Sequence, residues 1–140
     1  MTNALKGNVL FVDDDKFLAD MYGMKFAGAG YGIHTCLSVS EALEALHGGF
    51  AADAIVFDIL MPERDGFSLL ETLKSERLVS RAALIALTNQ SDDAEKRRAE
   101  SLGVDRYIVK ATMIPSEVVH AVEEEVAKKK KTAPPQNAVQ

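Results

Sequence analysis

The sequence predicts an α/β domain in which a five-stranded parallel sheet is covered by helices on both faces. Short apolar runs alternate with helical stretches five times along the chain. Most of these runs are continuously apolar, which is typical of strands whose two faces are both covered. With 140 residues, 47% of them hydrophobic, the chain has the length and composition of one such domain.

The first part of the chain contains two strand–helix units. The first strand is predicted at residues 8–12, and the helix after it ends at the glycine-rich segment 28–32. We expect one side of this helix to carry Phe17, Leu18, Met21 and Tyr22. A less regular strand follows at 32–36. Ser38 and Glu41 then form an S-x-x-E capping box, which predicts the start of the second helix.

Three further strands are predicted, at residues 53–58, 82–88 and 105–110. A helix over 66–76 connects the first two of these strands and has apolar residues at helical spacing. This order completes an alternating series, so we expect successive strands to be joined by helical crossovers.

The last two predicted helices differ in the apolar surface that they carry. The helix at 91–102 has only Ala94, Ala99 and Leu102 to face inward, so we expect it to have low local stability. The last helix begins at about Pro115 and carries a stripe of Val118, Val119, Val122 and Val126. We expect residues 8–128 to form the folded domain, with a lead-in at 1–7 and a disordered tail at 129–140.

Composition and charge exclude several classes of protein. A net charge of −5 does not favour nucleic acid as a partner. No apolar run approaches the roughly 20 residues that span a bilayer, and the N-terminus lacks the pattern of a signal peptide. Cys36 is the only cysteine, so no internal disulfide can form. We therefore expect a cytoplasmic protein without membrane insertion.

Polar residues stand at the ends of four predicted strands. Asp13 and Asp14 directly follow the first strand, and the third strand ends at Asp58, the fourth at Thr88 and the fifth at Lys110. A single aspartate at such a position is more often a helix cap than a functional group. The carboxyl ends of parallel strands meet at one edge of a sheet, however, and ligands bind there. Four such ends in register therefore indicate a functional site.

This combination of groups suits phosphoryl transfer. Carboxylate oxygens are ligands for Mg2+, and the ion neutralises charge on phosphoryl oxygens. A carboxylate can act as the nucleophile and become an acyl phosphate. A hydroxyl and an ammonium group can hold the remaining oxygens. Asp15, by contrast, is interpreted as a helix N-cap or first-turn acid and not as a metal ligand.

Four segments of the chain resemble the signature segments of response-regulator receiver domains. They are FVDDDK, VFDILMPERDG, IALTN and RYIVKA, in that order, and the resemblance extends over 8–128. It implies a CheY-like, stand-alone receiver with a flavodoxin-like (βα)5 doubly wound fold and strand order 2-1-3-4-5.

The resemblance also implies the roles of the residues around the metal. Asp58 matches the aspartate that is phosphorylated. Asp13 and Asp14 match the acidic pair that binds Mg2+, with Asp14 as the direct ligand and Asp13 acting through water. Asp58 and the backbone carbonyl of Leu60 complete this metal site. Because the Leu60 side chain cannot activate water, our hypothesis is that the phosphorylated state is long-lived.

The remaining matched residues would form the switch. Thr88 corresponds to the hydroxyl that moves onto the phosphoryl group, Lys110 to the ammonium that pairs with it, and Tyr107 to the aromatic ring whose orientation follows Thr88. Ala111 stands where receivers usually have proline, so we expect a trans bond and a shifted loop. Asn89 replaces a usually smaller residue, which would narrow access to the phosphoryl group.

The function that the resemblance implies is that of a single-domain response regulator in a two-component phosphorelay. A sensor histidine kinase or a histidine phosphotransfer protein would phosphorylate Asp58, and a protein-binding surface on the fourth helix, fifth strand and fifth helix would switch. The protein would not be an enzyme beyond catalysing its own phosphotransfer and dephosphorylation. It would be a monomer or a phosphorylation-dependent dimer, with an unknown downstream protein target.

Two alternatives remain at this point. One is a receiver-fold protein-binding module that phosphorylation does not control. The other is a haloacid-dehalogenase-like phosphatase that uses Asp13, although Phe17 stands where its D-x-D-x-T/V motif requires threonine or valine. The aspartate that carries the phosphoryl group distinguishes the phosphatase from the receiver.

Overall fold

The computed structural model describes residues 5–79 and 81–132 and contains one parallel sheet. Its strands are β1 (Asn8–Val12), β2 (Gly32–Cys36), β3 (Ala54–Phe57), β4 (Ala83–Thr88) and β5 (Arg106–Val109). Their order across the sheet is β2-β1-β3-β4-β5, and each neighbouring pair is parallel. The predicted flavodoxin-like fold and strand order are thus confirmed.

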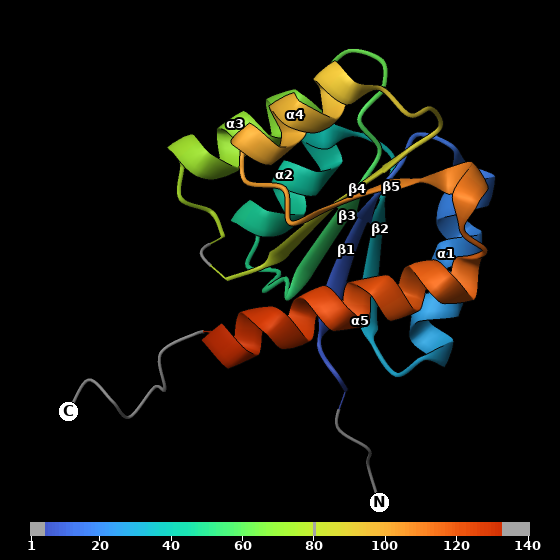
Figure 1. Cartoon of the computed structure of the whole chain (residues 1–140). Helices are drawn as coiled ribbons and strands as arrows, with labels where there is room; N and C mark the ends of the chain where they lie inside the picture. Colours follow the sequence, from blue (N-terminus) through green and yellow to red (C-terminus); the bar gives the residue numbers. More distant parts are fainter. Residues whose placement is uncertain (1–4, 80, 133–140) are drawn as a thin grey trace, which may run out of the picture.

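Helices cover both faces of this sheet (Figure 1). The helices α1 (Lys16–Gly28) and α5 (Pro115–Thr132) lie on one face, and α2 (Val39–His47), α3 (Gly66–Ser75) and α4 (Asp93–Ser101) lie on the other. A short 3-10 turn, η1 (Lys110–Thr112), connects β5 to α5. Within the described residues, no helix is both long enough and apolar enough to cross a membrane.

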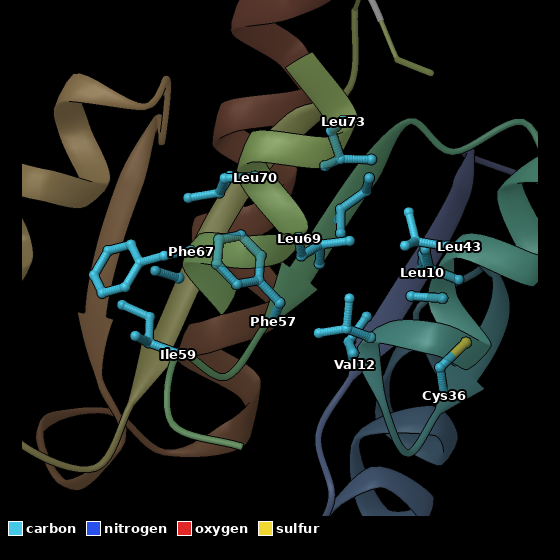
Figure 2. Packing of buried hydrophobic residues seen from close by; sticks show 14 of the residues in the cluster. Leu10, Val12, Cys36, Leu43, Phe57, Ile59, Phe67, Leu69, Leu70 and Leu73 are labelled. Carbon is cyan, nitrogen blue, oxygen red and sulfur yellow. The ribbon is translucent and has the colours of Figure 1, made fainter. Parts of the chain in front are cut away.

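The sheet separates two hydrophobic clusters because successive side chains of a strand point to opposite faces. In β1, Leu10 packs toward α2 and α3, whereas Phe11 packs toward α1 and α5. Figure 2 shows the first cluster, in which Phe57 of β3 lies near Phe67 and Leu69 of α3. Burial on both faces explains why β3 and nearly all of β4 are continuously apolar in sequence.

Polar side chains start the helices at the predicted places. Asp15 caps α1 by accepting the backbone N–H of Leu18 at 3.1 Å, so its prediction as an N-cap is confirmed. The Ser38 hydroxyl accepts the Glu41 N–H at 3.1 Å. The Glu41 carboxylate accepts the N–H of Leu37 instead of that of the cap residue, so the capping box is displaced by one residue.

Two side chains predicted to face inward are exposed. Phe17 is 82% exposed, because the buried face of α1 is formed by Ala19, Tyr22 and Phe26 and a residue two positions before Ala19 lies on the other side of the helix. Ala94 is also exposed, which leaves Ala99 as the buried residue of α4. The small buried surface predicted for α4 is therefore confirmed, and it is smaller than expected.

The last helix, α5, extends to Thr132, so residues 129–132 of the predicted tail are helical. Lysines suit the C-terminal end of a helix, where the macrodipole is negative. Lys128 pairs with Glu125 at 3.2 Å and Lys129 with Asp105 at 3.0 Å, which favours the added turn. The rest of the predicted tail, 133–140, lies outside the described residues, as do residues 1–4 of the predicted lead-in.

Candidate functional site

The site lies at the carboxyl ends of β1 and β3, the neighbouring central strands from which the chain proceeds to opposite edges of the sheet. Hydrogen bonds continue the sheet beyond both strands. The N–H of Asp13 donates to the carbonyl of Cys36 at 3.0 Å, and the N–H of Asp58 donates to the carbonyl of Val12 at 2.9 Å. The backbone that carries both carboxylates is thus held by neighbouring strands.

Asp13, Asp58 and Lys110 form a compact charged group. The two aspartates are 1% and 4% exposed, and the Lys110 ammonium lies 2.8 Å from Asp13 Oδ2 and 3.3 Å from Asp58 Oδ2. The remaining oxygens accept backbone N–H groups, Asp13 Oδ1 from Asp15 at 2.9 Å and Asp58 Oδ1 from Leu60 at 3.1 Å. One ammonium therefore faces two buried carboxylates, and the group keeps excess negative charge.

This arrangement shifts two pKa values. Burial raises the pKa of the Asp58 carboxyl; the Lys110 ammonium opposes the rise, and the Asp13 charge adds to it. Burial by itself would lower the pKa of Lys110. The hydrogen bond to Asp13 and the charges of Asp13 and Asp58 outweigh burial, so the pKa of Lys110 is raised. The lysine is accordingly charged at neutral pH.

The acidic cluster has the donors that a hard cation requires. Asp13, Asp14 and Asp58 each offer a carboxylate oxygen, and these oxygens lie within 4.8 Å of one another. Asp13 and Asp58 are buried and Asp14 is exposed, so one side of the cluster is open to solvent. An all-oxygen set with an open side fits Mg2+, which keeps several water ligands.

Thr88 and Tyr107 meet at a residue that the sequence reasoning missed. Thr88 is buried at the end of β4, and its hydroxyl donates to Glu95 Oε1 at 3.3 Å. The Tyr107 hydroxyl donates to the same oxygen at 2.7 Å and lies 3.2 Å from the Gln90 carbonyl. Burial and the hydrogen bond to Glu95 raise the pKa of Tyr107 to about 12.

A sequence signal for Glu95 does exist. Asp92 caps α4 and Glu95 is the third residue of that helix, which is the spacing of a capping box. That pattern predicts a local bond from Glu95 back to the cap residue. Among the described residues, the Glu95 carboxylate instead accepts hydrogen bonds from the hydroxyl groups of Thr88 and Tyr107.

The loop after Asp58 depends on Gly66, the first residue of α3. A Cβ atom at this position would lie 2.9 Å from the Asp58 carbonyl oxygen and 2.9 Å from the Ile59 Cα. The first residue of α3 therefore approaches the backbone of the site more closely than any larger residue allows.

The loop after β5 begins with a trans bond between Lys110 and Ala111, as predicted, and this bond lies at the start of η1. Asn89 is exposed beside Thr88.

Comparisons with known proteins agree with this geometry. The family model described as response regulator receiver domain matches residues 9–123. A gliding motility regulatory protein of Myxococcus xanthus is 32% identical over 105 residues, which are 75% of this chain and 13% of that protein. The response regulator SaeR of Staphylococcus aureus is 31% identical over 124 residues, which are 89% of this chain and 52% of that protein.

Solved structures give the same result. A CheY-like response regulator receiver domain protein from Methanospirillum hungatei has a TM-score of 0.83 and 25% identity, covering 93% of this chain and 100% of that one. A putative response regulator from Chloroflexus aurantiacus has a TM-score of 0.77 and 30% identity, covering 86% and 98%. By contrast, this chain spans between 13% and 52% of the curated relatives named above.

Proposed function

The chain belongs to the family of response regulator receiver domains in two-component systems, and from this premise we propose that it accepts a phosphoryl group on Asp58. The observation that carries the proposal is the contact of Lys110 with both Asp58 and the buried Asp13, beside an acidic cluster suited to Mg2+. A carboxylate that is held, desolvated and next to an ammonium group is well placed to act as a nucleophile.

The proposed reaction is transfer of a phosphoryl group from a phosphohistidine or from a small acyl phosphate. A carboxylate oxygen of Asp58 attacks phosphorus, and the bond from phosphorus to the histidine nitrogen or to the acyl oxygen breaks. The leaving group keeps the electron pair of that bond, and Asp58 becomes an acyl phosphate. Attack by water on the same phosphorus later releases inorganic phosphate and restores the carboxylate.

Residues around Asp58 would stabilise the charge that this reaction brings. The Lys110 ammonium, now 3.3 Å from Asp58 Oδ2, would pair with a phosphoryl oxygen. Asp13, Asp14, Asp58 and the Leu60 carbonyl would hold Mg2+. When bound, Mg2+ supplies positive charge against the phosphoryl oxygens. The chain would thus promote its own phosphorylation and dephosphorylation without acting on a separate substrate as an enzyme does.

The output would follow from Thr88. Its hydroxyl would donate to the phosphoryl group, Tyr107 would change position, and α4, β5 and α5 would present a protein-binding surface in the altered state. The phosphoryl donor would be a sensor histidine kinase or a histidine phosphotransfer protein. We propose these partners from the family.

Intact mass after incubation with acetyl phosphate and Mg2+ tests the proposal. We expect wild type to gain one phosphoryl group, Asp58→Asn to gain none, and Asp20→Asn to behave as wild type. Asp20 is a matched control because it is an exposed aspartate of α1 that pairs with Lys16. Omitting Mg2+ should abolish the gain.

Three results would overturn the assignment. A phosphoryl group on the Asp58→Asn protein would place the chemistry elsewhere. If Asp13→Asn lost the phosphoryl group while Asp58→Asn kept it, the phosphatase-like alternative would be favoured. No gain in wild type, with either acetyl phosphate or a phosphorylated histidine domain as the donor, would favour a binding module that phosphate does not control.

A further inference from the structure

The hydroxyl group of Thr88 is already engaged, and its partner is Glu95 on α4. The two atoms, Thr88 Oγ1 and Glu95 Oε1, are 3.3 Å apart. An ionised carboxylate only accepts hydrogen bonds, so the threonine must be the donor. A hydroxyl has one proton. Thr88 therefore cannot donate to Glu95 and to a phosphoryl oxygen on Asp58 at the same time.

The same oxygen of Glu95 also holds the aromatic residue of the switch. The Tyr107 hydroxyl donates to Glu95 Oε1 at 2.7 Å, so this one oxygen accepts hydrogen bonds from side chains of two different strands, β4 and β5. Hydrogen bonds to a charged acceptor are about twice as strong as neutral ones. Glu95 also lies in the first turn of α4, a helix whose buried residue is Ala99. Little apolar packing therefore fixes this helix, and the hydrogen bonds of Glu95 contribute more to its position.

We propose that Glu95 is a positioning residue that holds the side chains of Thr88 and Tyr107 toward α4. Its carboxylate competes with the phosphoryl group for the hydrogen bond that the Thr88 hydroxyl donates. This second role rests on the proposed function of Asp58. When the Thr88 hydroxyl donates its hydrogen bond to the phosphoryl group instead, Tyr107 remains as the hydroxyl donor to Glu95 Oε1. The first turn of α4 is then released from β4 while it stays tied to β5. Glu95 thus links occupancy of the site to the position of α4.

The test measures binding of beryllofluoride, a noncovalent phosphoryl analogue, in the presence of Mg2+, followed through the methyl NMR signal of Thr88. In Glu95→Gln the competing acceptor is neutral, so the analogue should bind about threefold to tenfold more tightly, the range for weakening one hydrogen bond. Glu100→Gln is the matched control, because it removes the same charge from an exposed position of α4. Its affinity should equal that of wild type.

A double-mutant cycle separates positioning from simple charge repulsion. If Glu95 acts through Thr88, Glu95→Gln should change the affinity less than about twofold in a Thr88→Val background, where binding is followed through the backbone N–H signals of the site instead of the Thr88 methyl signal. An equal gain with and without the threonine hydroxyl would overturn the proposal, because the carboxylate would then act only by repelling the anion.

The free chain provides a readout that does not depend on the proposed function. In the absence of analogue, Glu95→Gln should shift the Thr88 methyl and Tyr107 ring signals, and Glu100→Gln should not. If wild type neither binds the analogue nor gains a phosphoryl group from either donor, but these shifts occur, the positioning role is supported and the phosphorylation of Asp58 is refuted. If Glu95→Gln leaves both signals unchanged, the role of Glu95 is refuted whatever Asp58 does.

Discussion

Replacing Gly66 with alanine should destabilise the domain and disturb the backbone of the proposed phosphorylation site. The added Cβ would lie 2.9 Å from the Asp58 carbonyl oxygen, the Ile59 Cα and the Phe57 Cδ2. Ordinary contacts of this kind begin at about 3.4 Å, so these neighbours must move by roughly half an ångström. Two of the three atoms belong to the backbone, which cannot escape by changing a rotamer.

The expected magnitude follows from two opposing effects. Overpacking of this kind costs about 1–3 kcal/mol. The higher helix propensity of alanine returns at most about 1 kcal/mol, and less at the first residue of a helix. We therefore expect the free energy of unfolding to fall by about 1–2 kcal/mol, which corresponds to a melting temperature lower by about 3–7 °C at this chain length.

Urea unfolding followed by circular dichroism measures this change. Gly28→Ala is the control, since it lies at the end of α1 and its Cβ would have nothing within 4 Å. That variant should be as stable as wild type or more stable by up to about 1 kcal/mol. The reasoning would be refuted if Gly66→Ala unfolded at the same urea concentration as Gly28→Ala, with equal m-values.

Three more predictions concern the metal, the lifetime of the phosphorylated state and the fourth helix. Mg2+ at ten times its dissociation constant should stabilise wild type by about 1.4 kcal/mol in urea, and Asp14→Asn should reduce this gain; an equal gain in both would exclude Asp14 as a ligand. Leu60→Gln should shorten the lifetime of phosphorylated Asp58, measured by intact mass, because an amide can orient water; an unchanged decay would refute our hypothesis on Leu60. Amide hydrogens of α4 should exchange faster than those of α3, which buries five residues; slower exchange in α4 would contradict its low local stability.

The sequence was most informative where a local pattern and a global requirement agree. The continuous apolar run before Asp58 predicts a buried strand, and the burial of both faces of β3 confirms it. The edge of a parallel sheet then brings Asp13, Asp58 and Lys110 together without any knowledge of the helices. This is why the charged centre of the site could be predicted from strand ends alone.

The sequence was less informative where a side chain has two possible partners. The spacing of Asp92 and Glu95 predicts a local capping box, but Glu95 is directed at Thr88 and Tyr107, which belong to the strands before and after α4. Phe17 fits an apolar helix pattern and is nevertheless exposed, because the orientation of a helix is decided by its whole buried face. Tertiary packing decides both cases, and residue spacing along the chain does not specify it.

The two helices that flank the site are held to the domain in different ways, and this difference decides which of them can respond. The start of α3 is in backbone contact with the segment after β3 at Gly66, so it cannot move without moving Asp58. In α4, apart from the buried Ala99, the contacts with α3 are made by the exposed side chain of Arg98. Arg98 lies 4.1 Å from the centre of the Phe67 ring and 3.9 Å from Glu71.

Exposed contacts such as those of Arg98 are worth about 1 kcal/mol or less each. A charge-assisted hydrogen bond from Thr88 to a phosphoryl oxygen is worth about 1.5–3 kcal/mol, and forming it breaks the 3.3 Å bond from Thr88 to Glu95. The helix α4 then loses this contact and keeps its weak exposed ones. We therefore expect phosphorylation to change the position of α4 and to leave α3 in place. Beryllofluoride with Mg2+ should shift backbone NMR signals of α4 and β5 and leave those of the second half of α3 unchanged. Shifts of equal size in both helices would show that the site is coupled to the whole face of the sheet and not to α4 alone.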